Sequence, residues 1–518
     1  MPVPYRCLYN HELLILFTTR SPYQTYRENV KPEQATGYVR ELKGTAVDAL
    51  MICPTAWKMP LYVSDVDPRW KELKPAAEPL PESDWRYGDK VYWRVRRYMA
   101  TGADPVELSV RTANECGITP FISYRMNEMH YNEKPDYPTH SDFWRSNYRT
   151  KGLPNGGLDY SHPEVRDWYT RILFELIDKY DVGGIELDFC RFPSFFPESK
   201  AIEHMPLMTD LVRGIRKKLD DTARARGREL ALCVRVPRSI DAARGIGLDV
   251  ASWCRAGVVD MLNVSPFAFF TADIGIEEYK RHAGKVPVYG EMQFNTFLGE
   301  TPWHFRQTVF RHTTKAMYET AAYDFLKRGA DGVSFFNFCY TRDHSFSDPR
   351  LKRYPGTEPP FDILSHITDC EYLADRPKHY MLPRAPWPAN CGENTSGIPA
   401  RLSPGVPVPV RLHIADDMNA GHSFIRAMLR LESDSDIVGH DLEVVIAGKK
   451  CAPTFGPGEL FPPQSANALP RYENLLFYDV PLSVLTQGMN EFSLESRAPR
   501  EWSKWHIDII GMELALYR

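Results

Sequence analysis

The sequence has no long hydrophobic run and no excess of charge of one sign. The longest apolar run near its start, Leu13 to Phe17, is far shorter than the roughly 20 residues of a membrane-spanning helix. Lysine and arginine number 63 against 67 aspartate and glutamate, so no basic excess is present to neutralise nucleic acid or an anionic membrane. We therefore expect neither nucleic acid nor a membrane as a partner.

Several local signatures are also missing. The ten cysteines are scattered singly, with no CxxC pair and no Cys/His cluster at zinc spacing, so we expect no metal. The absence of a GxGxxG motif, a P-loop and a GxSxG elbow predicts no nucleotide cofactor and no serine nucleophile. The first ten residues lack the regions of a signal peptide, which predicts a cytoplasmic protein, or a periplasmic or secreted one if a leader has been removed.

What is present is an alternation of short buried strands with amphipathic helices. This pattern, in a chain of 518 residues, indicates a parallel sheet covered by helices. Because eight strands close a barrel, we predict a (β/α)8 TIM barrel rather than an open doubly wound sheet. The expected strands are 12–17, 46–53, 118–125, 182–189, 229–236, 258–264, 286–291 and 332–338. The expected helices are 32–43, 105–115, 163–180, 201–226, 249–256, 276–283 and 304–328.

The C-terminal part of the chain has a different pattern. Residues 354–407 are rich in proline, which predicts a linker packing on the barrel. Beyond them, short alternating runs separated by turn signals predict an antiparallel β-sandwich of jelly-roll type. We therefore expect a barrel over 1–353, the linker over 354–407 and an accessory sandwich over 408–518. The expected sandwich strands are 408–414, 424–431, 441–446, 473–480, 490–496 and 505–516.

Three carboxylates are the candidate catalytic residues. Glu186 and Asp188 lie two apart on one strand and therefore point to the same face, into the barrel near its rim. Two acids on a buried face repel each other, which raises at least one pKa. Glu291 ends the seventh expected strand, where strand stability does not call for a carboxylate. Asp188 and Glu291 could face each other across a glycosidic bond, or pair with an arginine as structural ion pairs.

Polar and aromatic residues follow the other strand ends, which suits a polyhydroxylated substrate because each hydroxyl both donates and accepts hydrogen bonds. Aromatic rings would stack on sugar faces, and arginines would hold the carboxylate or sulfate of an anionic sugar. By strand parity Arg125 and Asn127 share a face, whereas Glu128 does not. The candidate substrate-binding residues are Arg125, Asn127, Glu128, His130, Arg191, Arg235, Asn263, Gln293, Asn337, Tyr340 and Trp57.

The stretch YDVGGIELDFCRFP at 180–193 resembles the fourth-strand signature of glycoside-hydrolase barrels, most closely that of family 10-like glycosyl-hydrolase proteins. It is also similar to family 18 chitinases, in whose AspGlyXAspXAspXGlu strand Glu186 and Asp188 would match the inner acids. Cys190 stands where those enzymes have their catalytic glutamate. The resemblance to clan A hydrolases implies that Asp188 is the acid/base and Glu291 the nucleophile, although LeuAsp replaces the AsnGlu pair of that clan.

The sequence thus predicts a glycoside hydrolase that cleaves oligo- or polysaccharides by carboxylate chemistry at the C-terminal face of the barrel. Two alternatives stay open at this point. One is a non-catalytic carbohydrate-binding barrel, since a fold does not determine a function. The other is a polysaccharide lyase that abstracts a proton from a uronate glycan.

Overall fold

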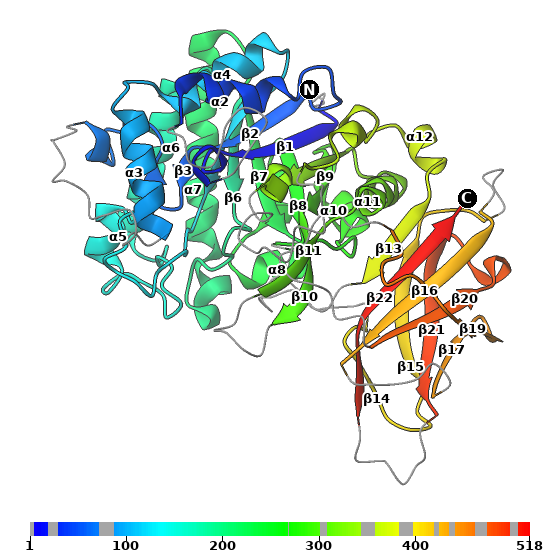
Figure 1. The fold of residues 1–518 in the computed structure, drawn as a ribbon. Coiled ribbons are helices and arrows are strands. Elements are labelled where there is room, and N and C mark those ends of the chain that lie inside the picture. The colour runs from blue at the N-terminus through cyan, green and yellow to red at the C-terminus, as the bar shows by residue number, and fades with distance from the viewer. Residues whose placement is uncertain are drawn as a thin grey trace.

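The chain forms two packed units, a closed barrel and a sandwich of two sheets (Figure 1). The structure, a computed structural model, describes residues 5–18, 30–71, 87–267, 269–300, 308–342, 358–382, 397–418, 424–434, 441–461, 474–497 and 506–518. The statements below concern these residues.

Eight parallel strands close the barrel and follow one another around it in chain order. The first strand, β1, pairs with both β2 and β12, which closes the ring. This arrangement confirms the predicted (β/α)8 fold. The strands are β1 (Cys7–Glu12), β2 (Ala49–Cys53), β5 (Thr119–Arg125), β6 (Gly184–Asp188), β7 (Ala231–Pro237), β8 (Met261–Ser265), β9 (Val288–Gln293) and β12 (Gly332–Phe336).

Helices cover the outside of the barrel, and their ends follow local sequence signals. Asp104 caps α4 by accepting hydrogen bonds from the backbone of its first turn, and Gly227 ends α7 in a left-handed conformation. The larger helices are α2 (Pro32–Arg40), α3 (Tyr87–Met99), α4 (Pro105–Glu115), α6 (Pro163–Lys179), α7 (Ala201–Arg226), α10 (Ile276–Ala283) and α11 (Lys315–Lys327). Shorter ones are α1 (Ile15–Thr18), α5 (Asp142–Asn147), α8 (Ile240–Gly245), α9 (Val250–Arg255) and α12 (Cys370–Ala374).

Two predicted elements are wrong. The first strand spans 7–12 rather than 12–17, and the apolar run that suggested a strand forms a turn and α1, whose residues are all buried. A buried run is apolar whether it is strand or helix, so periodicity could not separate the two. The predicted helix over 304–328 begins only at Lys315, because 308–312 form strand β11, which pairs with β10 (Asn295–Glu300).

The second unit is the predicted antiparallel sandwich, with an apolar core between its sheets. All six expected strands are present. Strands β13 and β14 fall within the segment predicted as a linker, yet both pair with β22. One sheet contains β13 (Lys378–Leu382), β14 (Ala400–Leu402), β16 (Arg426–Ser433), β19 (Ala452–Thr454), β20 (Leu475–Val480) and β22 (Ile507–Tyr517). The other contains β15 (Val408–Ile414), β17 (Leu442–Ile446), β18 (Lys449–Lys450) and β21 (Gly488–Ser496).

Helix α11 is the contact between the two units. The Thr320 hydroxyl accepts a hydrogen bond from the backbone of His379 at 2.7 Å, and the Asp324 carboxylate lies 2.6 Å from Nδ1 of His413. On its other side α11 packs against β9 and β12 of the barrel. The sandwich is therefore anchored to the barrel wall through one helix.

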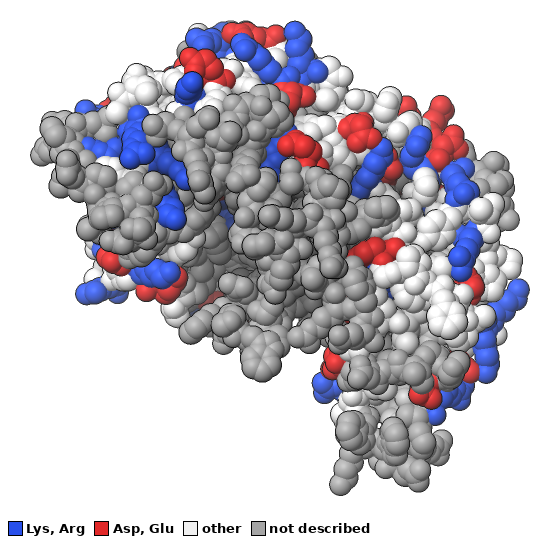
Figure 2. Space-filling view, in the orientation of Figure 1, with Lys and Arg blue, Asp and Glu red and all other residues white. Residues whose placement is uncertain are grey.

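Charged side chains of both signs are present on the face of the molecule drawn in Figure 2. Figure 2 shows acidic and basic side chains interspersed over the described part of one face of the molecule. Across the described ranges we find no helix with the length and apolar character needed to cross a bilayer. Nor do three His, Cys, Asp or Glu side chains of these residues gather as metal ligands would.

Candidate active site

The inside of the barrel changes from apolar to polar along its strands. Side chains that alternate inward form an apolar layer near the start of the strands, which includes Leu8, Phe121, Met261 and Tyr289. Two residues further along, the inward positions of most strands are polar, with β2 as an exception through Met51. The C-terminal end of a barrel is where active sites of this fold lie, and the polar layer lies at that end.

The loops at this end contain strained backbone. Five of the six non-glycine residues with positive φ in the described chain follow the C-terminal ends of barrel strands. Such conformations cost energy and cluster at functional sites. They are Trp57, Tyr131, Phe192, Phe267 and Asn337, with φ between 54° and 84°. The strain marks this end of the barrel independently of any polar residue.

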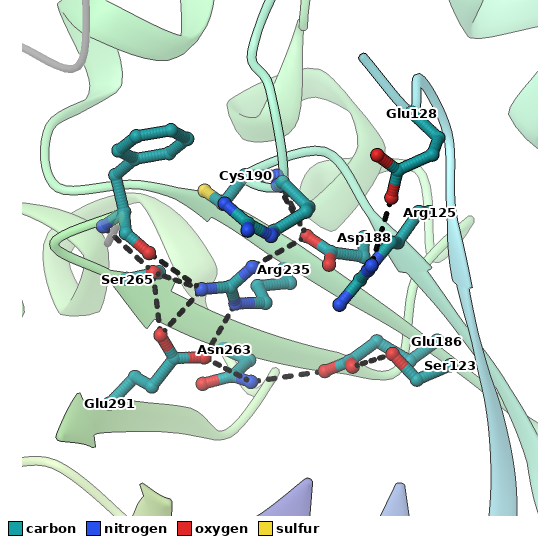
Figure 3. Close-up of polar contacts among 12 residues, drawn as sticks. Ser123, Arg125, Glu128, Glu186, Asp188, Cys190, Arg235, Asn263, Ser265 and Glu291 are labelled. Carbon is teal, nitrogen blue, oxygen red and sulfur yellow. Dashed lines mark hydrogen bonds and ion pairs between the residues drawn. The ribbon is translucent and has the colours of Figure 1, made fainter. Parts of the chain in front are cut away.

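Arg235 of β7 lies at the centre of the polar cluster (Figure 3). Its side chain is fully buried, and its guanidinium donates to Asp188 at 2.7 Å and to both oxygens of Glu291 at 2.5 and 2.8 Å. The guanidinium also lies 3.9 Å from the centre of the Phe336 ring. Two of the three predicted catalytic carboxylates, Asp188 and Glu291, are thus joined by one arginine, whose single positive charge they share.

The two carboxylates differ in how many of their oxygens are engaged. Both oxygens of Glu291 accept hydrogen bonds: besides Arg235, the donors are Ser265 at 2.6 Å, Gln293 at 2.5 Å and Asn263 at 3.4 Å. Asp188 accepts all its hydrogen bonds at Oδ1, from Arg235 and from the backbone of Cys190 and Arg191. Oδ2 of Asp188 accepts no hydrogen bond from a described residue.

Glu186 lies deeper than Asp188 on the same strand. Its carboxyl group accepts hydrogen bonds from Ser123 at 2.6 Å and Asn263 at 3.0 Å. Burial and the neighbouring Asp188 carboxylate raise the pKa of Glu186 to about 7. Burial also raises the pKa of Glu291, an effect that Arg235 opposes. The pKa rise predicted for adjacent acids is therefore found at Glu186.

Replacing Glu186 by glutamine should remove a pH dependence of stability. The carboxyl binds its proton with a pKa of about 7 when folded and about 4.5 when unfolded. The native state is therefore favoured below pH 4.5, and this advantage is lost as the pH rises through 7. The free-energy difference is about 3 kcal/mol, from 1.36 kcal/mol per pKa unit. Denaturant unfolding from pH 4 to 8 should show this fall in wild type but not in Glu186→Gln.

A suitable control for that measurement is Glu164→Gln, because the Glu164 side chain is 59% exposed. This variant should follow wild type at every pH. Parallel curves for wild type and Glu186→Gln over the same range would contradict the assignment of the raised pKa to Glu186.

A second charged group lies around Arg125 of β5. Arg125 forms an ion pair with Glu12 at 2.7 Å and donates a hydrogen bond to Glu128 at 2.8 Å, and all three side chains are buried. Nε2 of His130 lies 2.8 Å from Nη2 of Arg191. Since a guanidinium can only donate, Nδ1 of His130 carries the proton that faces Glu128. Burial would raise the pKa of Glu128, but His130 and Arg125 hold it well below its usual range.

The other candidate residues divide into those at the cluster and those elsewhere. Asn263 and Gln293 belong to the cluster, as their bonds to Glu291 show. Asn127 does not: its amide bonds only to the backbone of Leu158 and Ser194, so it ties two loops together. The parity argument that favoured Asn127 over Glu128 fails because β5 ends at Arg125 and alternation ends with it.

The remaining three candidates lie on loops at the same end of the barrel. Trp57 is 5% exposed and packs edge-on against Tyr131, so its ring is largely covered. Tyr340 lies beside Phe294, with ring centres 5.8 Å apart. Asn337 follows β12 in a left-handed conformation, and its Oδ1 is buried with no partner among the described residues.

The sequence analysis missed Glu12 and Asn10, which both lie at inward positions of a barrel strand; Ser265, a rim candidate after the sixth expected strand, donates to Glu291. Glu12 ends β1, and its Oε2 accepts no hydrogen bond from a described residue, whereas Oε1 pairs with Arg125. The misplaced first strand put Glu12 at its start rather than at its C-terminal end. Placing the strand at 7–12 would have made Glu12 a carboxylate at the rim, like Asp188 and Glu291.

No protein-family model matches the sequence, and no curated protein matches it. Solved structures with a similar fold include alpha-L-fucosidase isoenzyme 1 from Paenibacillus thiaminolyticus. It is 13% identical, with a TM-score of 0.36, over 95% of this chain and 97% of that one. An endo-beta-1,4-mannanase from Thermotoga petrophila is 12% identical, with a TM-score of 0.39 and coverage of 95% of each chain. A chitinase from Bacillus thuringiensis is 9% identical, with a TM-score of 0.39, over 96% of this chain and 98% of that one. These likenesses concern the fold alone.

Proposed function

We propose that the chain is a glycoside hydrolase whose reaction takes place at the C-terminal end of the barrel. The observation that carries the proposal is the pair Asp188 and Glu12. Both are buried carboxylates at inward strand ends, and each is held by an arginine through one oxygen while the other oxygen has no described partner. Two carboxyl groups at such a site are what hydrolysis of a glycosidic bond requires.

Asp188 and the arginine that binds Glu12 lie on neighbouring strands of the barrel. Arg125, which binds Glu12, is the direct register neighbour of Asp188 across β5 and β6. One carboxyl would protonate the glycosidic oxygen, while the other attacks the anomeric carbon or activates a water. Glu291, the nucleophile position implied by the resemblance, accepts five hydrogen bonds instead. We assign Glu291 to positioning Arg235. We assign Glu186 to holding a proton next to the charged Asp188.

The test is release of reducing ends from a broad panel of neutral and acidic glycans, by wild type and by Glu12→Gln. The variant keeps the hydrogen bond to Arg125 but loses the charge, so we expect turnover to fall by about 10²- to 10⁴-fold. Glu203→Gln, on the exposed side of α7, is the matched control and should keep full activity.

Other outcomes would reject the proposal in distinct ways. Glycan binding without any release of reducing ends would indicate a non-catalytic binding barrel. Ultraviolet absorbance of an unsaturated product would indicate a lyase. Full activity of Glu12→Gln would remove Glu12 from the mechanism.

A further inference from the structure

The arginines at the barrel mouth are already neutralised by the protein's own carboxylates. Arg235 binds Glu291 and Asp188, and Arg125 binds Glu12 and Glu128. Arg191 is the third arginine of the mouth, so three guanidinium groups face four carboxylates. Burial lowers the pKa of Lys58 to about 7, and the pKa of Glu186 is raised to about 7. Near neutral pH the partial positive charge of Lys58 therefore offsets the partial negative charge of Glu186.

This balance has a consequence for the charge of a ligand. A sugar carboxylate or sulfate could bind Arg125 or Arg235 only by displacing a buried acid. The displaced acid would be left buried and unpaired, at a cost of several kcal/mol. The site therefore offers an anionic ligand little net attraction.

Four of the buried polar atoms without a described partner at the mouth are acceptors, and Nε of Arg191 is a buried donor without one. The side-chain nitrogens of Asn263 and Gln293 donate to carboxylates, which fixes the orientation of both amides. Their carbonyl oxygens are buried with no hydrogen-bond partner in the described part of the chain, as are Oδ1 of Asn10 and of Asn337. A buried acceptor without a donor costs about 1–3 kcal/mol, and a ligand with O–H or N–H groups would remove that cost.

These four acceptors lie on consecutive strands of the barrel. Asn263 belongs to β8, Gln293 to β9 and Asn10 to β1, while Asn337 follows the end of β12. The order around the barrel is β8, β9, β12, β1. The unpaired acceptors thus line one continuous half of the wall, which also contains Glu12 and Glu291, while the two arginines that pair with these acids lie on β5 and β7.

A groove near the mouth also lacks free positive charge among its described lining residues. Its volume is about 820 Å³, within the usual range of ligand sites. One wall is the segment 193–197, which is separated from Arg191 by Phe192 alone. The other walls come from the segments that follow β5 and β7 and from α10. The groove contains the carboxylates of Glu198, Asp241 and Glu278 together with Phe195 and Phe196, and its described lining residues include no lysine, arginine or histidine.

We infer that this chain selects a glycan without negative charge, one sugar of which binds at the mouth while neighbouring sugars occupy the groove. The inference rests on the proposed function for the site itself and deepens it by naming the substrate class. It replaces the anionic sugar that Arg125, Arg191 and Arg235 suggested in the sequence, because two of these arginines are engaged by acids.

The test is calorimetric binding to the full chain, with glycans supplied in matched pairs. Each pair consists of an uncharged oligosaccharide and its derivative oxidised to the uronate or sulfated, at equal length and linkage. A glucosamine hexamer, whose amino groups can pair with the carboxylates of the groove, is measured as well. We expect the uncharged member of each binding pair to bind at least tenfold more tightly than its anionic derivative. Tighter binding of the anionic member, or no binding of any pair, would overturn the inference.

A charge-reversed groove provides a second arm. The double variant Glu198→Lys, Asp241→Lys should weaken binding of the glucosamine hexamer at least tenfold. Asp210→Lys, on the exposed side of α7 outside the groove, should not. Equal affinity of the double variant and wild type would exclude the groove. Because binding is measured without turnover, selective binding in the absence of hydrolysis would reject the proposed hydrolase and leave the charge selection standing.

Discussion

Asp188→Asn should lower turnover by about 10³-fold or more while the protein remains folded. The asparagine keeps an oxygen that can accept the backbone hydrogen bonds from Cys190 and Arg191, so the loop after β6 retains its anchor. What is lost is the charge at Oδ2, the oxygen that has no described donor. A carboxylate that acts directly on the reacting atoms contributes this much or more to turnover.

The measurement is the rate of reducing-end release on the best glycan of the panel, with circular dichroism and thermal melting to confirm the fold. Asp167→Asn is the matched control, because Asp167 lies on the exposed face of α6 in an ion pair with Arg171. Turnover within a few-fold of wild type in Asp188→Asn would show that another group performs the chemistry.

The second large effect concerns stability. Arg235→Met should lower the free energy of unfolding by about 3–5 kcal/mol, because it leaves Glu291 and Asp188 buried without their shared cation. Adding Glu291→Gln to this variant removes one of the two unpaired charges and should restore part of the loss. The two effects should therefore be strongly non-additive, as expected for residues in one network.

Denaturant unfolding at neutral pH measures both variants. Arg213→Met is the control, since Arg213 pairs with Asp210 on the surface, and it should change the free energy by less than about 0.5 kcal/mol. If the double variant is no more stable than Arg235→Met alone, Glu291 and Arg235 are not energetically coupled.

Much of the fold could be predicted because barrel strands are short apolar runs that end in polar residues. Seven of the eight predicted strands coincide with an observed barrel strand. The exception is instructive: β1 contains Asn10, His11 and Glu12, so its inward polar positions interrupt the hydrophobic pattern. The strand was missed because the polar side chains that it places at the barrel mouth break the apolar run.

Several residues of the candidate site could be predicted from the sequence, but the contacts between them could not. Strand parity placed Glu186 and Asp188 inside the barrel, and their positions at strand ends placed Arg235 and Glu291 at its rim. Neither argument could show that Arg235 would bind two acids at once, since that depends on side chains from three strands meeting in space. The same limit applies to the sandwich, where β13 and β14 pair with β22, far away in sequence.

Helix α11 has a consequence for the integrity of the protein as a whole. Ten consecutive residues of this helix, Ala316 to Phe325, are buried, which is the pattern of a helix covered on all sides. On the barrel side Phe325 fills the space against Gly290, next to Glu291 in β9. The sandwich covers the other side with His379 and His413. The sandwich thus supports the outer side of α11, and a barrel without the sandwich would expose this buried helix directly behind Glu291.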